Sequence, residues 1–254
     1  MFGDRIESKD GFDFYLYPQK ELTDIEKNRF SNIMVIGDTG VGKSTWLHCF
    51  INYLQGIQIE ENNRYYLFDE KKLQKEYEEK TGEKKTKGCS VTDKPAIYNI
   101  QPKNAFNNPL RLIDTDGFGD VRGEKYDKKI MEDIQNLFTN EIESLHAICL
   151  MFKASETRAH DRAKLLLDKL FSLFGEEIKN NIVIIFTFVD DFDDIPALVT
   201  LTDEKSPFIN ILGMNYHILN LIIKLISKKI KKALKEYSKI IQKILINYLI
   251  MYFH

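Results

Sequence analysis

The chain has 254 residues, a length typical of one or two domains, and its 43% hydrophobic content is enough for a sizeable core. Its formal net charge of −2 gives no overall reason to expect nucleic-acid binding. The three cysteines lie far apart and form no C-x-x-C or Cys/His pair, which argues against a zinc site or a disulfide framework. Because the first ten residues are charged where a signal peptide needs an apolar core, we expect a cytoplasmic protein.

The first 30 residues mix aromatic and charged side chains and contain no motif that carries chemistry. A short amphipathic helical segment between Leu22 and Phe30 is compatible with the pattern. We interpret residues 1–30 as a lead-in that packs on the domain that follows.

A phosphate-binding loop is the strongest signal in the chain, in the sequence IMVIGDTGVGKST at residues 33–45. Its first four residues form an apolar run typical of a strand buried in a parallel sheet, and a helical periodicity begins at Thr45. The stretch GDTGVGKS matches G-x-x-x-x-G-K-[ST], in which glycines let backbone amides approach phosphates. Lys43 can reach the β- and γ-phosphates, and the Ser44 hydroxyl can ligate Mg²⁺. The predicted nucleotide-binding residues here are Gly37, Asp38, Thr39, Gly40, Val41, Gly42, Lys43, Ser44 and Thr45.

A long insertion, residues 55–88, separates this helix from the next strand, and its charged stretch from Asp69 to Lys80 predicts a solvated helix. A strand is predicted from Ala96 to Ile100. In a nucleotide switch, a threonine just before this strand can close over the γ-phosphate and Mg²⁺. Thr92 is therefore our candidate magnesium ligand and Ser90 the reserve, with an ordinary loop hydroxyl as the alternative.

A second motif follows the strand predicted from Leu110 to Ile113. Asp114-Thr115-Asp116-Gly117 is a D-x-x-G sequence, which is weak alone but strong at a strand end downstream of a complete phosphate loop. Asp114 is expected to hold Mg²⁺, directly or through water, and the Gly117 amide to meet the γ-phosphate.

Together, GDTGVGKST and DTDGFGDVRG resemble the AIG-type GTPases of the TRAFAC class, which include the GIMAP proteins and are related to septins and the chloroplast import GTPases. The resemblance covers roughly residues 31–200. It implies hydrolysis or switching controlled by nucleotide-dependent dimerisation, with GTP/GDP and Mg²⁺ as cofactors. Later patterns fit as well, with helices predicted at 126–138 and 159–174 and strands at 147–152 and 182–189.

The last of these strands leads into Thr187-Phe188-Val189-Asp190, where the family carries [NT]-K-x-D to recognise guanine. The Asp190 carboxylate can accept hydrogen bonds from guanine N1–H and the 2-amino group, which adenine cannot offer, and Thr187 matches the first position. Phe188 replaces the lysine, and its ring either stacks on the base or points into the core. The alternative for Asp190 is one acid of a run that caps a helix at Ile195.

The sequence offers no evident catalytic residue, because Phe118 stands where many small GTPases place a water-orienting glutamine. We therefore expect slow intrinsic turnover, with a partner subunit completing the site. Arg122 and Arg158 are the weak catalytic candidates, and the favoured alternative for each is a surface or structural arginine.

The C-terminal stretch departs from the family pattern. Residues 217–254 contain eight lysines and a single acid, Glu236, and apolar residues recur there at three- and four-residue spacing. Such a helix packs on the nucleotide domain or in a coiled coil, or lies on an anionic membrane. A spanning anchor is disfavoured because Ile244 to Phe253 is only ten residues. An altered reading frame without selected function is a further alternative.

Strands that alternate with helices predict an α/β fold, that of a P-loop NTPase with a doubly wound, mostly parallel sheet flanked by helices and a C-terminal helical extension. We divide the chain into a lead-in (1–30), a GTPase domain (31–205) and a basic amphipathic tail (206–254).

The predicted function is a guanine-nucleotide-binding switch with slow, dimerisation-dependent GTP hydrolysis. Predicted partners are guanine nucleotide, a second copy of the chain and a membrane surface reached through the tail, but no nucleic acid. The alternatives are a non-hydrolysing assembly or membrane-associated scaffold module and an ATP-dependent P-loop enzyme, for which no arginine-bearing lid is evident.

Overall fold

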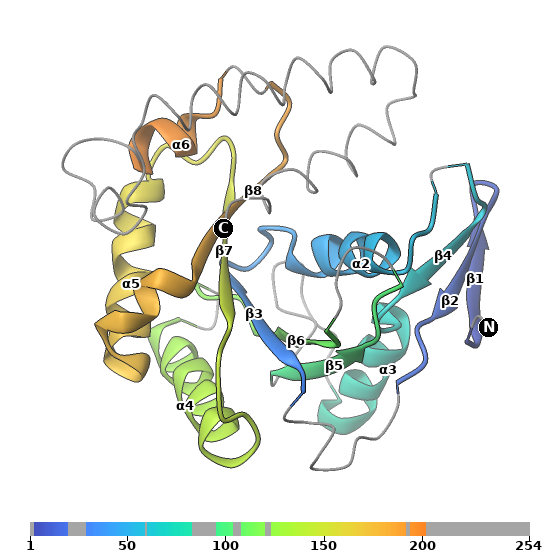
Figure 1. The fold of residues 1–254 in the computed structure, drawn as a ribbon, viewed down its shortest axis with the longest axis horizontal. Coiled ribbons are helices and arrows are strands. Elements are labelled where there is room, and N and C mark those ends of the chain that lie inside the picture. The colour runs from blue at the N-terminus through green and yellow to red at the C-terminus, as the bar shows by residue number, and fades with distance from the viewer. Residues whose placement is uncertain are drawn as a thin grey trace. The chain divides into compact units, whose positions relative to one another are not determined.

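The computed structural model describes residues 3–19, 29–58, 60–82, 95–103, 108–119, 123–191 and 194–201, without the side chains of residues 80 and 81. The chain forms two compact units, Met1–Ile148 and Cys149–His254, and has an α/β fold in which strands alternate with helices (Figure 1). The predicted helical segment before Phe30 and the predicted C-terminal tail lie mainly or wholly outside the described residues.

The core of the first unit is built on β3 (Ser31–Gly37), β6 (Leu110–Asp114) and β5 (Ala96–Ile100). β3 pairs with β6 in parallel and β5 pairs with β6 in antiparallel, a mixture common in α/β sheets. Most of β3 is buried, which explains its apolar run from Ile33 to Ile36. Every residue of β6 is buried as well, including the charged Arg111 and Asp114 beside its three apolar residues. These strands confirm the three sequence predictions for this region.

Helix α2 (Lys43–Leu54) follows β3 through the glycine-rich loop and begins two residues before the predicted start. It buries an apolar face that includes Trp46, Leu47, Phe50 and Ile51. This burial fixes the helix in the core, and its amino end therefore lies at a defined place beside the loop.

A second, three-stranded sheet has the order β1-β2-β4 and was not predicted. β1 (Arg5–Lys9) and β2 (Phe12–Leu16) form an antiparallel hairpin, and β4 (Asn63–Tyr66) pairs with β2 in parallel. Both turn residues, Asp10 and Gly11, have positive φ (51° and 83°), the requirement of a type I′ hairpin turn.

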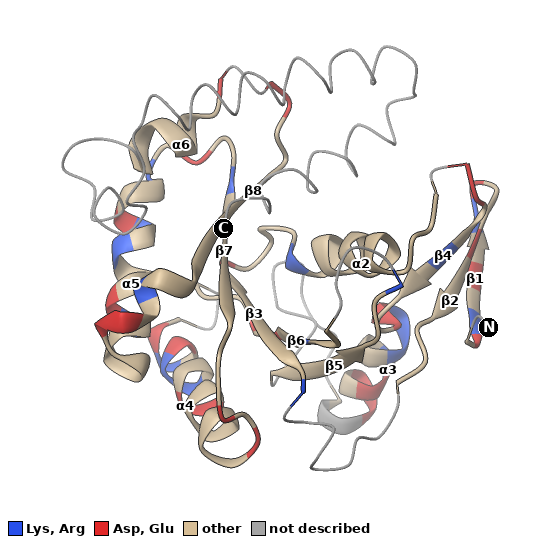
Figure 2. Ribbon diagram, viewed as in Figure 1, with Lys and Arg blue, Asp and Glu red and all other residues tan. Residues whose placement is uncertain are grey.

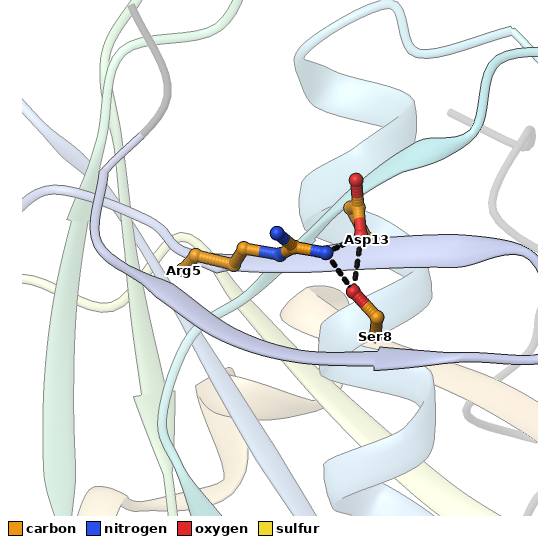
Figure 3. A network of polar contacts seen from close by, with 3 residues as sticks. All are labelled: Arg5, Ser8 and Asp13. Carbon is orange, nitrogen blue, oxygen red and sulfur yellow. Dashed lines mark hydrogen bonds and ion pairs between the residues drawn. The ribbon is translucent and has the colours of Figure 1, made fainter.

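The hairpin carries a polar network on its surface (Figure 3). Arg5 donates hydrogen bonds to Ser8 and Asp13, and the Ser8 hydroxyl donates to the same Asp13 carboxylate. The network joins the two strands across the turn.

Two polar side chains of α2, Asn52 and His48, bind the backbone at the second sheet. Asn52 donates from Nδ2 to the Tyr65 carbonyl oxygen at 2.8 Å and accepts from the Tyr65 amide at 2.7 Å. His48 Nδ1 accepts a hydrogen bond from the Leu67 amide at 3.1 Å. The helix that starts at the glycine-rich loop is therefore fixed on one side by β4.

Two surface helices complete the first unit. α3 (Glu70–Thr81) confirms the predicted charged helix, and the Asp69 carboxylate caps it by accepting from the amides of Lys71 and Lys72. α4 (Glu124–Asn140) confirms the helix predicted at 126–138 and buries residues such as Ile130 and Ile134. Figure 2 shows both signs of charge on α3 and α4.

In the second unit, β7 (Ala147–Lys153), which starts at the end of the first unit, lies next to β8 (Ile182–Thr187). α5 (Ala159–Phe174) has the predicted bounds and packs with α6 (Pro196–Leu201), and the short 3₁₀ helix η1 (Glu176–Asn181) precedes β8. β8 ends two residues before the predicted Val189. No helix within the described part of the chain is long and apolar enough to cross a membrane.

Candidate functional site

The glycine-rich loop connects the carboxyl end of β3 to the amino end of α2. Gly40 and Gly42 have φ of 74° and 96°, a left-handed conformation that favours glycine. Gly42 is also the N-cap of α2 and brings no side chain to the helix start, so the first-turn amides of α2 have no cap from this residue. Such a helix start, with its positive dipole end, suits a phosphate group.

Lys43 is the cation of the loop. Its Nζ donates to the carbonyl oxygens of Gly37 at 3.1 Å and Asp38 at 3.2 Å, so the side chain curls back over the loop. Burial lowers the pKa of the Lys43 ammonium, and the charges of Asp114, Asp116 and Asp38 oppose this shift. The structure thus places the predicted phosphate-binding lysine and the two carboxylates of the D-x-x-G segment in one electrostatic neighbourhood.

Asp114 lies at the carboxyl end of β6 and is 1% exposed. Neither of its carboxylate oxygens has a hydrogen-bond partner among the described residues. Burial raises the Asp114 pKa to about 7, although the nearby Lys43 charge opposes the shift. A buried carboxylate without partners is costly, so this position fits a bound cation.

The residues present fit Mg²⁺. Ser44, in the first turn of α2, and Asp114 offer a hydroxyl and a carboxylate, the oxygen donors that Mg²⁺ prefers. Groups of three or more His, Cys, Asp or Glu that could hold a metal are absent from the described residues, and Mg²⁺ commonly uses only one or two carboxylates beside phosphates and water.

Three residues around the D-x-x-G segment carried no functional prediction. Asp116, 2% exposed, accepts a hydrogen bond from the Tyr126 hydroxyl at 2.8 Å. Asp127 accepts from the Gly119 amide at 3.0 Å. The first turn of α4 therefore holds the segment through two buried side chains. The only sequence signal that these residues hold the D-x-x-G segment was the pair Tyr126-Asp127 at the start of the predicted helix.

Phe118 directly follows the D-x-x-G segment and is 1% exposed. Its ring is part of the core, whereas its backbone forms an isolated parallel bridge with Asp38 of the phosphate loop. The side chain at this position is buried and apolar, which supports the expectation that it does not orient a water molecule.

The predicted base-recognition residues lie in the second unit, at the end of β8. Thr187 is buried, and its hydroxyl donates to the Phe152 carbonyl oxygen at 3.2 Å. Phe188 has a positive φ of 54° and is 57% exposed, so its ring does not point into the core. Asp190 and Asp191 are both exposed.

The remaining candidates are placed less centrally or are not described. Arg158 is exposed at the N-cap of α5, where its amide donates to Glu156 Oε1 at 3.1 Å. Thr45 is exposed on the first turn of α2. Thr92, Ser90 and Arg122 lie outside the described residues.

Comparison with known proteins gives a consistent group of matches. Residues 82–209, just over half of the chain, match the model of the AIG1 family. GTP-binding protein A of Dictyostelium discoideum is 26% identical over 159 residues, which cover 63% of this chain and 28% of that protein. Septin-8-A of Danio rerio is 28% identical over 131 residues, or 51% of this chain and 25% of the septin. The chain thus spans about a quarter of the length of these curated relatives.

Among solved structures, Toc33 from Arabidopsis thaliana in complex with Mg²⁺ and GMPPNP matches with a TM-score of 0.44 and 15% identity. The match covers 76% of this chain and 67% of the Toc33 chain. A structure of a probable GTP-binding protein engB matches with a TM-score of 0.38 and 14% identity, over 82% of this chain and the whole of that chain.

Proposed function

Because this chain belongs to the AIG1 family, we propose that it is a guanine-nucleotide-binding switch protein with slow, dimerisation-dependent GTP hydrolysis. The observation that carries this proposal is the arrangement of Lys43 and Asp114 beside the phosphate loop. A cation held over the loop carbonyls and a buried, unpartnered carboxylate are the two charged groups that binding of a metal-nucleotide complex requires. Similarity to GTP-binding protein A of Dictyostelium discoideum supports guanine nucleotide as the ligand.

The roles of the residues follow from their positions. The loop amides and the start of α2 bind the phosphates, and Lys43 neutralises the β- and γ-phosphate charge. Ser44 and Asp114 would hold Mg²⁺, which when bound draws the phosphate oxygens together and offsets their charge. The Gly117 amide would meet the γ-phosphate. Thr92, which we propose as the other magnesium ligand, lies outside the described residues.

Guanine recognition is assigned to the end of β8. The exposed Asp190 carboxylate can accept from guanine N1–H and the 2-amino group, and the exposed Phe188 ring offers a face on which a base can stack. The buried Thr187 hydroxyl donates to the Phe152 carbonyl oxygen and so helps to fix the end of β8.

We expect unlabelled GTP to displace a fluorescent GTP analogue, with Mg²⁺ present, at least about tenfold more effectively than ATP, since two hydrogen bonds to a charged carboxylate distinguish the bases. Asp190→Asn should remove most of this preference, because an amide cannot accept both bonds. Asp191→Asn, which changes the neighbouring exposed carboxylate in the same way, is the matched control and should retain it. Equal competition by GTP and ATP in the unsubstituted protein would reject guanine recognition and favour an ATP-dependent enzyme.

The burial of Phe118 favours a second candidate, an assembly module that holds its nucleotide without hydrolysing it. We expect phosphate release at about 10⁻³ s⁻¹ or slower, the range of small GTPases without an arginine finger. If a second copy completes the site, the rate per chain should rise with protein concentration. Single-turnover phosphate release over a hundredfold range of protein concentration measures this. Negligible release at every concentration, with nucleotide still bound, would replace the switch by the assembly module.

A further inference from the structure

Gly117, the residue proposed to meet the γ-phosphate, packs directly against Thr39 of the phosphate loop. A Cβ built on Gly117 would lie 2.4 Å from Thr39 Oγ1, 2.5 Å from its Cα and 2.6 Å from its amide nitrogen. Such distances are far below van der Waals contact, so the D-x-x-G backbone reaches this position only because residue 117 is glycine.

Hydrogen bonds from the phosphate loop fix two consecutive peptide groups of the D-x-x-G segment. The Thr39 hydroxyl donates to the Gly117 carbonyl oxygen at 3.0 Å, and the Phe118 amide donates to the Gly37 carbonyl oxygen at 3.2 Å. The Thr39 amide then donates to the Phe118 carbonyl oxygen at 3.0 Å. One residue of the loop, Thr39, thus bonds to the segment through both its side chain and its backbone.

Two residues of α4 also hold the same segment. Asp127 accepts from the Gly119 amide, and Tyr126 donates to Asp116, so polar contacts flank the Gly117–Phe118 peptide on both sides. Of all these contacts, the Thr39 hydroxyl is the only one made by a side chain of the phosphate loop within the described residues. It can therefore be removed without altering the loop backbone.

The position of Gly117 affects triphosphate and diphosphate differently. The γ-phosphate lies beyond the phosphates that the loop amides cradle, and only a triphosphate has a group for the Gly117 amide to bind. A segment already held against the loop spares the triphosphate the cost of ordering it, whereas a diphosphate gains nothing from this order.

We propose that Thr39 is a specificity-determining residue that raises the preference for a nucleoside triphosphate over a diphosphate by holding Gly117 against the phosphate loop. This inference rests on the proposed function of the same site. It assigns to the Thr39 side chain a role separate from phosphate binding by the loop amides.

The test compares dissociation constants for GMPPNP and GDP, each with Mg²⁺, for the full chain and three variants. Thr39→Val replaces the hydroxyl by a methyl group of similar size and should lower the GMPPNP-to-GDP affinity ratio by about tenfold, the effect of one hydrogen bond. Thr39→Ser keeps the hydroxyl and should restore the ratio. Thr139→Val, which removes the hydroxyl that donates to the Gln135 carbonyl oxygen on the exposed face of α4, is the matched control and should leave the ratio unchanged.

The outcomes separate the inference from the proposed function. A ratio that falls in Thr39→Val and recovers in Thr39→Ser supports the inference. If Thr39→Val binds both nucleotides but keeps or raises the ratio, or weakens both equally, the inference fails while the proposed function stands. If the unsubstituted chain binds neither nucleotide, both are overturned.

Discussion

Replacing Lys43 with methionine should weaken binding of a Mg²⁺–GTP complex by at least about 100-fold, because the loop loses the charged donor that faces the β- and γ-phosphates. The structure gives a second reason for a large effect. Lys43 is the cation whose attraction opposes the upward pKa shift of Asp114, so without it the pKa of Asp114 rises further and the neutral carboxyl becomes a poorer magnesium ligand.

Titration with a fluorescent GTP analogue measures this effect, with far-UV circular dichroism to show that the variant is folded. Lys43→Gln, which keeps a hydrogen-bond donor without the charge, should lose nearly as much affinity as Lys43→Met. Lys71→Met is the matched control, since Lys71 is an exposed lysine of α3 that is 78% accessible and lies outside the loop. Affinity within threefold of the unsubstituted protein in the folded Lys43→Met variant would show that the loop does not bind phosphates through this lysine.

The elements of the fold that could be predicted are those whose own residues form a recognisable local sequence pattern. β3 carries an apolar run because both of its faces are largely buried, and the bounds of α5 follow from its apolar periodicity. The glycine-rich loop was predictable because its motif sits between a strand and a helix and because the positive φ of Gly40 and Gly42 requires glycine.

The second sheet could be predicted only in part. Asp10-Gly11 is a strong hairpin signal between two alternating runs, so β1 and β2 were within reach of sequence reasoning. β4 was not, because its four residues, Asn63–Tyr66, are too short and polar to stand out. Their strand conformation depends on pairing with β2 and on the hydrogen bond that Asn52 donates and the one that it accepts, which are contacts between residues well apart in the sequence.

Some features of the candidate site could be predicted from sequence motifs and others could not. Lys43 and Asp114 belong to motifs, and in the structure the charge of each acts on the other. The contact between Tyr126 and Asp116 and the packing of Thr39 on Gly117 follow from how the segments fold onto each other, and no spacing rule encodes them. The sequence did not predict whether the Phe188 ring is exposed or buried, because an aromatic residue beside a buried strand end is compatible with both.

His48 is expected to make the folded protein less stable as the pH falls. Its imidazole stacks on Tyr66 with ring centroids 4.4 Å apart and lies 4.6 Å from Phe68, and its Nε2 has no hydrogen-bond partner among the described residues. Burial lowers the His48 pKa to about 4, from the ordinary histidine value of 6.5. The side chain is therefore neutral in the folded protein at pH values where it is protonated in the unfolded chain.

The sign of the effect follows from proton binding. Above pH 6.5 neither state protonates His48 and no penalty arises. Between pH 6.5 and about 4 the unfolded chain binds a proton that the folded chain does not, so stability falls by about 3 kcal/mol over this window. Asp114, whose pKa is raised by burial, acts in the opposite direction over an overlapping range, so the His48 contribution must be measured as a difference between variants.

His48→Asn supplies that difference, because the asparagine amide oxygen can replace Nδ1 as the acceptor for the Leu67 amide without titrating. At pH 7 we expect the variant to be less stable than the unsubstituted protein, since it loses the stacked ring. On lowering the pH to 4, the stability difference should shift by about 3 kcal/mol in favour of the variant. Urea unfolding followed through Trp46, the single tryptophan and a buried residue of the same helix, reports this shift directly. A stability difference for His48→Asn that stays constant from pH 7 to 4 would show that His48 is not held neutral by its surroundings.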